Sequence, residues 1–237
     1  MAIGIIGAME TEIEALTKRE MEAGETIEKA GMVFHAGRLG SRDVVVVRSG
    51  IGKVNAAICA QILVDCFGIT HLINTGIAGS LDKRIGIGDI VVSTDAVQHD
   101  MDLSPLGFER GAIPRLDAPV VLREFPADPL LREAAAAVCR EAAPGSRVFE
   151  GRIVSGDQFI CDAQQKTFLA ESFGALCTEM EGAAIAHTAY VNRVPFVIVR
   201  AISDSADEKA DVSFAEFERR AAKTCAGIVA HMVRSLK

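Results

Sequence analysis

The sequence has fewer basic than acidic residues and no long apolar run. It contains 25 Lys and Arg against 32 Asp and Glu, which gives a formal net charge of −7 at pH 7. A module that binds nucleic acid or an anionic membrane would need a basic face, so this balance argues against both kinds of partner. No run approaches the roughly 20 apolar residues that span a bilayer. The N-terminal apolar stretch has no basic residue before it and turns acidic at Glu10, so we expect no signal peptide.

Metal-ligand patterns are missing as well. The six cysteines form no C-x-x-C pair, and most of them lie in apolar stretches, where a reduced cysteine behaves as a small hydrophobic residue. The five histidines show no H-E-x-x-H or similar ligand spacing. Neither a disulfide framework nor a zinc site is indicated. We therefore expect a cytoplasmic protein that uses no metal and no cofactor.

Three widespread catalytic or nucleotide-binding motifs are absent. The segment 49–54 (SGIGKV) is superficially like a P-loop, but Val47 occupies the position of the first glycine. Val54 replaces the Ser or Thr that would bind magnesium. No G-x-G-x-x-G dinucleotide fingerprint and no G-x-S-x-G nucleophile elbow occurs. These absences argue against kinases, the common NAD enzymes and α/β-hydrolases.

Strand-length apolar runs alternate with helical patterns along the chain. The segment Lys53–Cys66 is Ala-rich with apolar residues at helical spacing, and Gly68 ends it. Asp128, followed by proline, forms a typical helix start, from which a helix runs to residue 142. Ser213 and Glu216 fit a capping box that opens a final helix. Strands are expected at Ala2–Ile6, Asp43–Val47, Thr70–Asn74, Asp89–Val92, Arg147–Val154, Ala175–Cys177 and Phe196–Ile202, with Val33–Leu39 as a hairpin partner of the second.

This alternation predicts the α/β class. The 237 residues suit one domain, 1–237, with 49% hydrophobic residues for its core. We expect a three-layer α/β/α architecture around a central mixed, largely parallel twisted sheet. One long irregular stretch, His99–Pro119, is typical of a lid or a contact surface.

Glycines and acidic residues recur where the predicted strands end, which is the edge at which open parallel sheets bind ligands. Glu12 falls on the apolar side of a short helix, where a carboxylate must be paired or used. Complementation of the helix dipole explains Glu12 equally well. Asp204 ends an apolar strand, where a turn-forming or capping role is the simpler interpretation. Glu181 begins a helical run, so helix-dipole complementation explains it too.

Eight blocks of the sequence carry a resemblance to a known family. They are GIIGAMETEI (4–13), SGIGKVNAA (49–57), NTGIAGS (74–80), GDIVVS (88–93), VSGDQFI (154–160), EMEGAAIAH (179–187), VPFVIVRAISDSAD (194–207) and SFAEF (213–217). In this order they are similar to the 5′-methylthioadenosine/S-adenosylhomocysteine nucleosidases of the nucleoside phosphorylase superfamily. The resemblance implies a nucleoside phosphorylase-like fold, hydrolysis of adenine nucleosides in methionine salvage, and a homodimer with the 99–119 segment at its interface.

The resemblance also implies roles for individual residues. Asp204 corresponds to the general acid that protonates N7 of adenine, and Glu12 to the acid that positions and activates the attacking water. Glu181 corresponds to the acceptor for the ribose hydroxyls. The other implied substrate-binding residues are Met9 and Met180 at the sugar, Phe159 and Ile160 at the purine, Ile51 and Phe214 at the 5′-substituent, Ser203 beside the general acid, Arg200 near the water, and Ala78 and Glu179.

Other functions remain as alternatives. A purine nucleoside phosphorylase would carry Gly-Asp-Pro-x-Arg after the first strand, whereas residues 7–12 read GAMETE, which would repel phosphate. A non-catalytic nucleoside-binding protein on the same fold would not need a buried proton donor at Asp204. A calcium-dependent purine ribohydrolase would need an N-terminal Asp cluster, which is absent. Leu106 stands where some relatives place an aromatic residue at the partner's 5′ pocket, which leaves the preferred 5′-substituent open.

Overall fold

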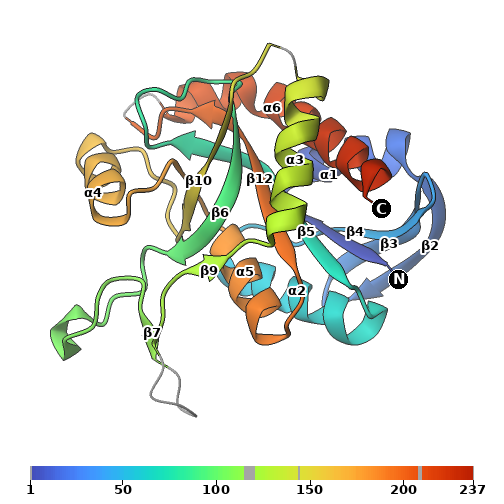
Figure 1. Ribbon diagram of the computed structural model, residues 1–237, viewed down its shortest axis with the longest axis horizontal. Coiled ribbons are helices and arrows are strands. Elements are labelled where there is room, and N and C mark those ends of the chain that lie inside the picture. Colours follow the sequence, from blue (N-terminus) through green and yellow to red (C-terminus); the bar gives the residue numbers. More distant parts are fainter. Residues whose placement is uncertain (1, 115–120, 144, 208–209, 237) are drawn as a thin grey trace.

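A mixed β-sheet forms the centre of the computed structural model, which describes residues 2–114, 121–143, 145–207 and 210–236 (Figure 1). In this part of the chain, ten strands belong to the sheet, in the order β11-β10-β6-β12-β5-β1-β4-β3-β2, with β9 beside β6. Their bounds are β1 Ile3–Gly7, β2 Glu22–Lys29, β3 Met32–Leu39, β4 Arg42–Arg48, β5 His71–Ser80, β6 Ile90–Gln98, β9 Phe125–Pro126, β10 Val148–Ser155, β11 Cys177–Glu179 and β12 Phe196–Asp204. A separate pair consists of β7 (Ile113–Pro114) and β8 (Val121–Leu122).

The sheet is mixed, with parallel pairs on both sides of an antiparallel junction between β6 and β12. β1 pairs in parallel with β4 and β5, β12 with β5, and β10 with β6 and β11. Antiparallel pairs join β12 to β6, and β3 to β2 and β4. β11 pairs with β10 on one side and with β5 on the other, so that five strands close into a ring. The mixed α/β prediction is confirmed, and the ring is a feature that the linear pattern did not reveal.

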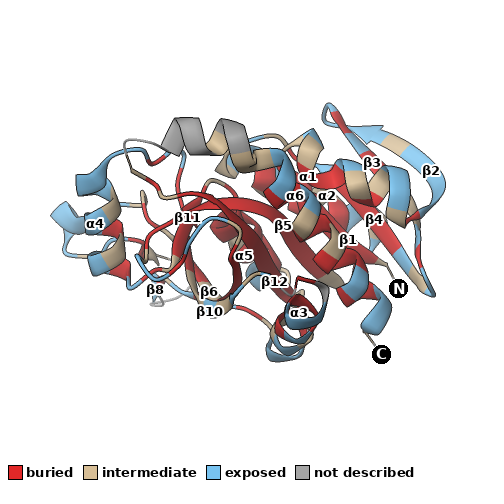
Figure 2. Cartoon of the chain, turned by 90° about the horizontal axis from the view of Figure 1, so that it is seen from above, coloured by how far each residue is buried: buried red, intermediate tan, exposed pale blue. Residues whose placement is uncertain are grey.

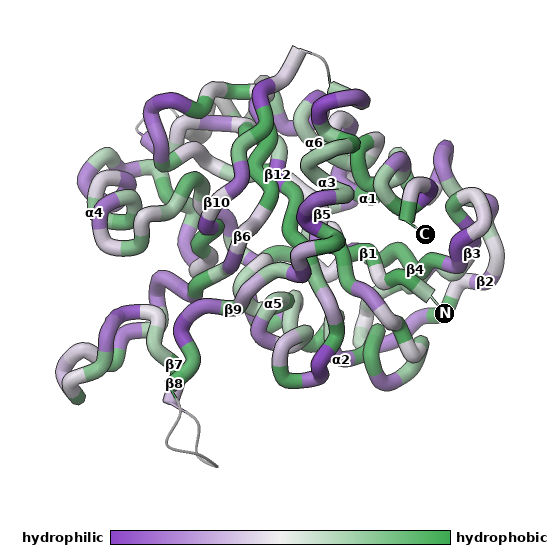
Figure 3. The backbone as a smooth tube through the Cα atoms, viewed as in Figure 1, coloured by the Kyte–Doolittle hydropathy of each residue, from purple (hydrophilic) through white to green (hydrophobic). Residues whose placement is uncertain are grey.

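Helices cover both faces of the sheet, so the predicted layers are present (Figure 1). One hydrophobic cluster joins the sheet to α1, α3 and α6, and a second joins it to α2 and α5. Figure 2 shows the central strands buried, and Figure 3 shows β12 as largely hydrophobic. The helices are α1 Glu10–Ala15, continued by a π-helical segment Leu16–Glu20, α2 Lys53–Phe67, α3 Pro129–Ala142, α4 Ala163–Phe173, α5 Gly182–Val191 and α6 Ala210–Ser235.

Two helix ends follow the predicted chemistry, and one does not. Gly68 ends α2 in the left-handed conformation, with φ of 56°. The carboxylate of Asp128 accepts a hydrogen bond of 2.9 Å from the N–H of Leu131 at the start of α3. The capping box predicted at Ser213 is wrong, because α6 begins at Ala210 and Ser213 therefore lies inside the helix.

The largest difference from the expected strands is at β5. The sequence predicted its end at Asn74, yet the strand continues through the glycine-rich segment to Ser80. It can do so because β12 pairs with it along residues 72–79 and β11 pairs with Gly79 and Ser80. β6 likewise runs on to Gln98, and β11 lies at Cys177–Glu179 rather than Ala175–Cys177. The mostly exposed strand β2 was not predicted, since its polar sequence lacks an apolar face.

The irregular segment after β6 extends away from the sheet at the lower left of Figure 1. It contains a short 3-10 turn at Ser104–Leu106 and the strand β7. Residues 115–119 of the predicted irregular stretch lie outside the described residues. Among the helices of the described chain, none has both the length and the apolar character needed to cross a membrane.

Candidate active site

A cavity lies beyond the carboxyl ends of the parallel strands, where the sequence predicted a ligand site. Its volume, including the open mouth, is about 610 Å³, which is in the usual range for a small-molecule site. Its lining is Ala8, Met9, Glu12, Ile51, Ile77, Ala78, Gly79, Gln158, Phe159, Ile160, Thr178, Glu179, Met180, Glu181, Ser203, Asp204 and Phe214. The ionisable residues of this lining are all acidic.

Glu12 is held at the start of α1 by three backbone donors. Its Oε2 accepts hydrogen bonds from the N–H groups of Ala8 (2.6 Å) and Met9 (3.0 Å), and its Oε1 accepts one from Ile77 (3.1 Å). Burial raises the pKa of Glu12, while the positive charge of Arg200 and the three backbone donors act in the opposite direction. Glu12 is 3% exposed, so it lies on the buried side of α1 and also accepts from the N–H groups at the start of the helix, which fits both interpretations that the sequence left open.

Arg200 on β12 is the cation that balances the acids on this side. Its Nη2 donates to Glu179 Oε2 and to Asn74 Oδ1, the latter at 2.6 Å, and the side chain is fully buried. Burial lowers the pKa of Arg200, but the carboxylates of Glu179, Glu12 and Glu181 outweigh that effect and raise it. Gly76 makes this packing possible, because a Cβ there would collide with both Arg200 and Glu12.

Glu179 and Glu181 flank the turn into α5 and have different surroundings. Glu179 accepts hydrogen bonds from the Ser155 hydroxyl and from the N–H groups of Glu181 and Gly182, in addition to the bond from Arg200. Glu181 accepts one backbone bond, from Gly52 at 2.8 Å. Burial and the neighbouring Glu179 raise the pKa of Glu181 to about 8. Glu181 therefore keeps acceptor capacity for a ligand, whereas the Glu179 oxygens are used by the protein.

Asp204 ends β12 on another side of the cavity. Its Oδ2 accepts from the Ser203 hydroxyl at 2.8 Å, and its Oδ1 accepts from the N–H of Ala206 at 2.8 Å. Burial raises the pKa of Asp204, and these two donors only partly oppose the increase. A Cβ at Gly79 would lie 2.7 Å from Oδ1, so glycine is again required where a strand passes a buried acid.

Apolar side chains form the rest of the wall. The rings of Phe159 and Phe214 meet edge to face with their centroids 5.7 Å apart. Phe159 is 45% exposed and Ile51 is 54% exposed, so both present apolar surface at the mouth of the cavity. A flat, partly apolar ligand with polar groups on its edges fits such a lining.

The structure brings together all but one of the site residues that the sequence predicted. Twelve of the thirteen line the cavity, and Arg200 lies behind Glu12 and Glu179 without reaching the lining. The prediction did not include five further lining residues, Ala8, Ile77, Gly79, Gln158 and Thr178. Ile77 and Gly79 lie in the glycine-rich segment beyond the predicted end of the strand at Asn74, and Gln158 immediately precedes Phe159. Among the described residues, no group of three or more His, Cys, Asp and Glu could hold a metal ion.

Comparisons with known proteins agree with this architecture. The sequence model of the phosphorylase superfamily matches residues 2–234. A 5′-methylthioadenosine/S-adenosylhomocysteine nucleosidase of Treponema pallidum (strain Nichols) is 43% identical over 254 residues, covering 100% of this chain and 94% of the relative. The nucleosidase of the same name from Neisseria meningitidis, solved with methylthio-immucillin-A, superimposes with a TM-score of 0.93 at 39% identity, over 99% of both chains. Futalosine hydrolase of Helicobacter pylori strain 26695 superimposes with a TM-score of 0.91 at 36% identity, over 100% of this chain and 98% of its own.

Fold and site together define a member of the phosphorylase superfamily. Within that superfamily, the chain belongs to the 5′-methylthioadenosine/S-adenosylhomocysteine nucleosidases, which are enzymes. The family resemblance carried by the eight sequence blocks is thereby confirmed.

Proposed function

We propose that this enzyme hydrolyses the N-glycosidic bond of 5′-methylthioadenosine and S-adenosylhomocysteine, releasing adenine and the corresponding 5-thioribose sugar. The observation that carries the proposal is the arrangement of Glu12, Glu181 and Asp204 around one cavity, each with a pKa raised by burial. Raised pKa values bring carboxyl groups close to the pH at which they can donate or accept a proton. The names of the full-length relatives identify the substrate class.

Asp204 is the proton donor in this proposal. Its proton passes to N7 of adenine while the bond between N9 and C1′ breaks, and the bonding electron pair leaves with the purine. Water adds to C1′, and Glu12 takes the proton that the water loses. General acid catalysis contributes about two to four powers of ten to the rate. Ser203, whose hydroxyl donates to Asp204, orients the acid.

The sugar develops positive charge as the bond lengthens, and the acids on its side stabilise that charge. Glu181 accepts hydrogen bonds from the ribose hydroxyls. It can do so because only one protein donor, the N–H of Gly52, bonds to its carboxylate in the described part of the chain. Met180 packs beneath the sugar, with Met9 beside it, and both line the cavity. Arg200 acts from behind the lining, where its bond to Glu179 and its charge near Glu12 keep these two carboxylates in place.

The remaining lining residues hold the purine and the 5′-substituent. The exposed ring of Phe159 stacks on the adenine, and the backbone of Ile160 meets its hydrogen-bonding edge. Ala78 borders the same end of the cavity, next to Gly79 and Asp204. Ile51 and Phe214 contact the 5′-group, which fits their apolar character.

Phosphate could take the place of water as the group that attacks the sugar, but the negative charge of the cavity disfavours its binding. The ionisable lining residues Glu12, Glu179, Glu181 and Asp204 are acidic, so a phosphate ion would enter against their negative charge. Arg200 does not offset this charge at the cavity surface, because it lies behind Glu12 and Glu179 and is not part of the lining.

The proposal is tested by incubating the purified enzyme with 5′-methylthioadenosine, with and without phosphate, and identifying the sugar product. We expect adenine and free 5-methylthioribose in both reactions. Formation of the sugar 1-phosphate, and only when phosphate is present, would show a phosphorylase. Binding of the nucleoside without any release of adenine would show a non-catalytic binding protein.

The substrate range includes 5′-deoxyadenosine in our proposal, because the apolar wall at the 5′ end accepts a methyl group. Futalosine is a second candidate, favoured by the structural similarity to futalosine hydrolase. Comparing kcat/KM for the four nucleosides ranks them. Release of adenine from 5′-methylthioadenosine places the enzyme in methionine salvage.

We further propose a cytoplasmic homodimer with the 99–119 segment at its interface. Leu106 of that segment is 72% exposed, and Val54 on α2 is 69% exposed, so both offer apolar surface to a second copy. The six cysteines are all unpaired, as in proteins of a reducing compartment. Sedimentation equilibrium of the wild type and of Leu106→Asp tests the dimer, and the substitution should weaken it.

A further inference from the structure

A second cavity adjoins the first where the proposed function places the 5′-substituent. It lies between the β1–α1 turn, β3 and the end of β4, and it shares Ala8, Met9 and Ile51 with the first cavity. In the proposed function, Met9 and Ile51 lie beside the sugar and the 5′-substituent. The second cavity therefore continues the site in the direction in which a longer 5′-substituent extends.

Charged side chains of both signs line this second cavity. Arg48 is the last residue of β4, opposite Gly7 of β1, and Glu10 is the first residue of α1. The Nε atom of Arg48 lies 4.0 Å from Oε2 of Glu10, and the two side chains are 56% and 54% exposed. An ion pair with this separation and exposure is weak, so both groups can turn to a ligand. His35 on β3 adds a third polar side chain.

The two substrates of the proposed function differ at this place. 5′-Methylthioadenosine ends in a methyl group on the sulfur, whereas S-adenosylhomocysteine carries an amino acid there, with an ammonium and a carboxylate. The first cavity has acidic ionisable groups only, and it would repel that carboxylate. The second cavity supplies a guanidinium, whose planar donors match a carboxylate, and a carboxylate that suits the ammonium.

We propose that Arg48 and Glu10 form a subsite for the amino-acid end of S-adenosylhomocysteine. Arg48 binds the carboxylate, Glu10 binds the ammonium, and Met9 and Ile51 line the passage between the subsite and the ribose. The proposal rests on the proposed function, because it requires the 5′ end of the nucleoside to lie at Met9.

The test compares Arg48→Met with a matched control, Arg38→Met. Arg38 on β3 makes a similar exposed ion pair, 3.6 Å from Asp43, and lines neither cavity. We expect Arg48→Met to lower kcat/KM for S-adenosylhomocysteine about tenfold. The values for 5′-methylthioadenosine and for 5′-butylthioadenosine, whose tail is uncharged, should stay within about twofold of wild type. Arg38→Met should change none of the three.

Two results would overturn the subsite. An equal loss of kcat/KM with all three substrates would mean that Arg48 supports the site as a whole. An unchanged kcat/KM with all three would mean that the amino-acid end of S-adenosylhomocysteine binds elsewhere. Calorimetric affinity for S-adenosylhomocysteine, measured in an Asp204→Asn background, keeps the question separate from turnover. If the wild type releases no adenine, the proposed function fails, while weaker binding after Arg48→Met still supports the subsite.

Discussion

The two acidic sides of the cavity are built differently around the same strand. At Gly79 of β5, Asp204 is buried and accepts only neutral donors in the described part of the chain. Three residues earlier, at Gly76, Glu12 packs against Arg200, which also binds Glu179. Burial raises the pKa on both sides, but only at Gly76 does a buried cation counteract it. One strand thus passes an acid held by neutral donors and, three residues away, an acid beside a buried arginine, which fits the two different roles that we propose for them.

The largest expected effect comes from removing the proton acceptor. Glu12→Gln should abolish hydrolysis, because an amide cannot take a proton from water, while the side chain keeps its size and can still accept from Ala8 and Met9. Adenine release is measured by a coupled assay, and circular dichroism reports the fold. Turnover close to that of wild type would contradict the role of Glu12.

Asp204→Asn removes the proton donor but keeps both hydrogen bonds of the side chain possible. The amide oxygen can accept from the N–H of Ala206, and the amide nitrogen can donate to the hydroxyl oxygen of Ser203. We expect kcat to fall by about two to four powers of ten. Affinity for the nucleoside, measured by calorimetry, should largely survive. A loss of binding as large as the loss of turnover would indicate a structural role.

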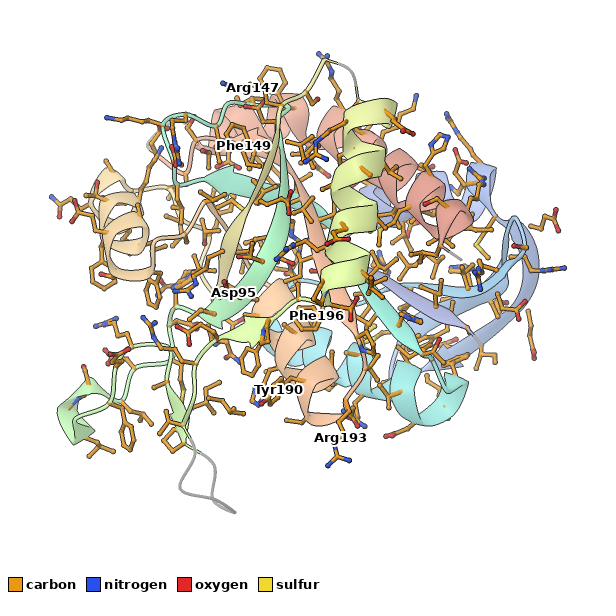
Figure 4. All side chains as sticks on the ribbon, in the orientation of Figure 1. Asp95, Arg147, Phe149, Tyr190, Arg193 and Phe196 are labelled. Atoms are coloured by element: carbon orange, nitrogen blue, oxygen red, sulfur yellow. The ribbon has the colours of Figure 1, made fainter. Side chains whose placement is uncertain are left out.

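Arg200→Met tests how far the buried arginine stabilises the neighbouring carboxylates on the Gly76 side of the cavity. It leaves Glu12, Glu179 and Glu181 buried without their cation, and the expected loss of unfolding free energy is about 3–5 kcal/mol in urea titrations. The control is Arg147→Met. The Arg147 side chain is 64% exposed, pairs with the mostly buried carboxylate of Asp89, and lies beside Phe149 at the top of Figure 4. Its loss should cost less than that of Arg200, because Asp89 keeps the backbone donors of Gly86 and Arg147. Equal losses would mean that burial does not distinguish the two arginines.

Glu181→Gln should stabilise the enzyme at alkaline pH. The pKa of Glu181 is about 8 in the folded protein and 4.5 in its reference state, so the folded form binds the extra proton between these values. Wild-type stability therefore falls as pH rises from 4.5 to 8, and the variant lacks this contribution. We expect Tm of the variant to exceed that of wild type by roughly 5 °C at pH 8.5 and to match it near pH 4.5.

The exposed residue Glu14 provides the matched control for that measurement. A hydrogen bond from Lys18 lowers its pKa, but both partners are exposed, so solvent screens the pair and its effect on stability is small. Glu14→Gln should leave the dependence of Tm on pH unchanged. A Tm difference for Glu181→Gln that does not vary with pH would contradict the raised pKa.

Much of this site follows from the sequence because family blocks identify the acids, yet local pattern alone left Glu12, Glu181 and Asp204 with simpler explanations. The structure adds burial for all three acids and, for Glu12 and Glu181, backbone donors that lie far away in the chain, at Ile77 and Gly52. The hydrogen-bond partners of Asp204 are its close neighbours Ser203 and Ala206, so its role as proton donor stays a prediction. The glycine-rich segment after Asn74 shows the same limit. Its composition indicates a loop, and it forms a strand because β12 and β11 satisfy its backbone while its glycines leave room for Arg200, Glu12 and Asp204.

The division of roles between the two sides is tested most directly with a substrate whose leaving group needs no proton. The 4-nitrophenyl glycoside of 5-methylthioribose releases a stable phenolate, so its cleavage requires Glu12 but not Asp204 in this account. We predict that Asp204→Asn cleaves this glycoside at a rate near that of wild type while failing on 5′-methylthioadenosine, and that Glu12→Gln fails on both. Equal impairment of Asp204→Asn on the two substrates would contradict the assignment of Asp204 as the proton donor.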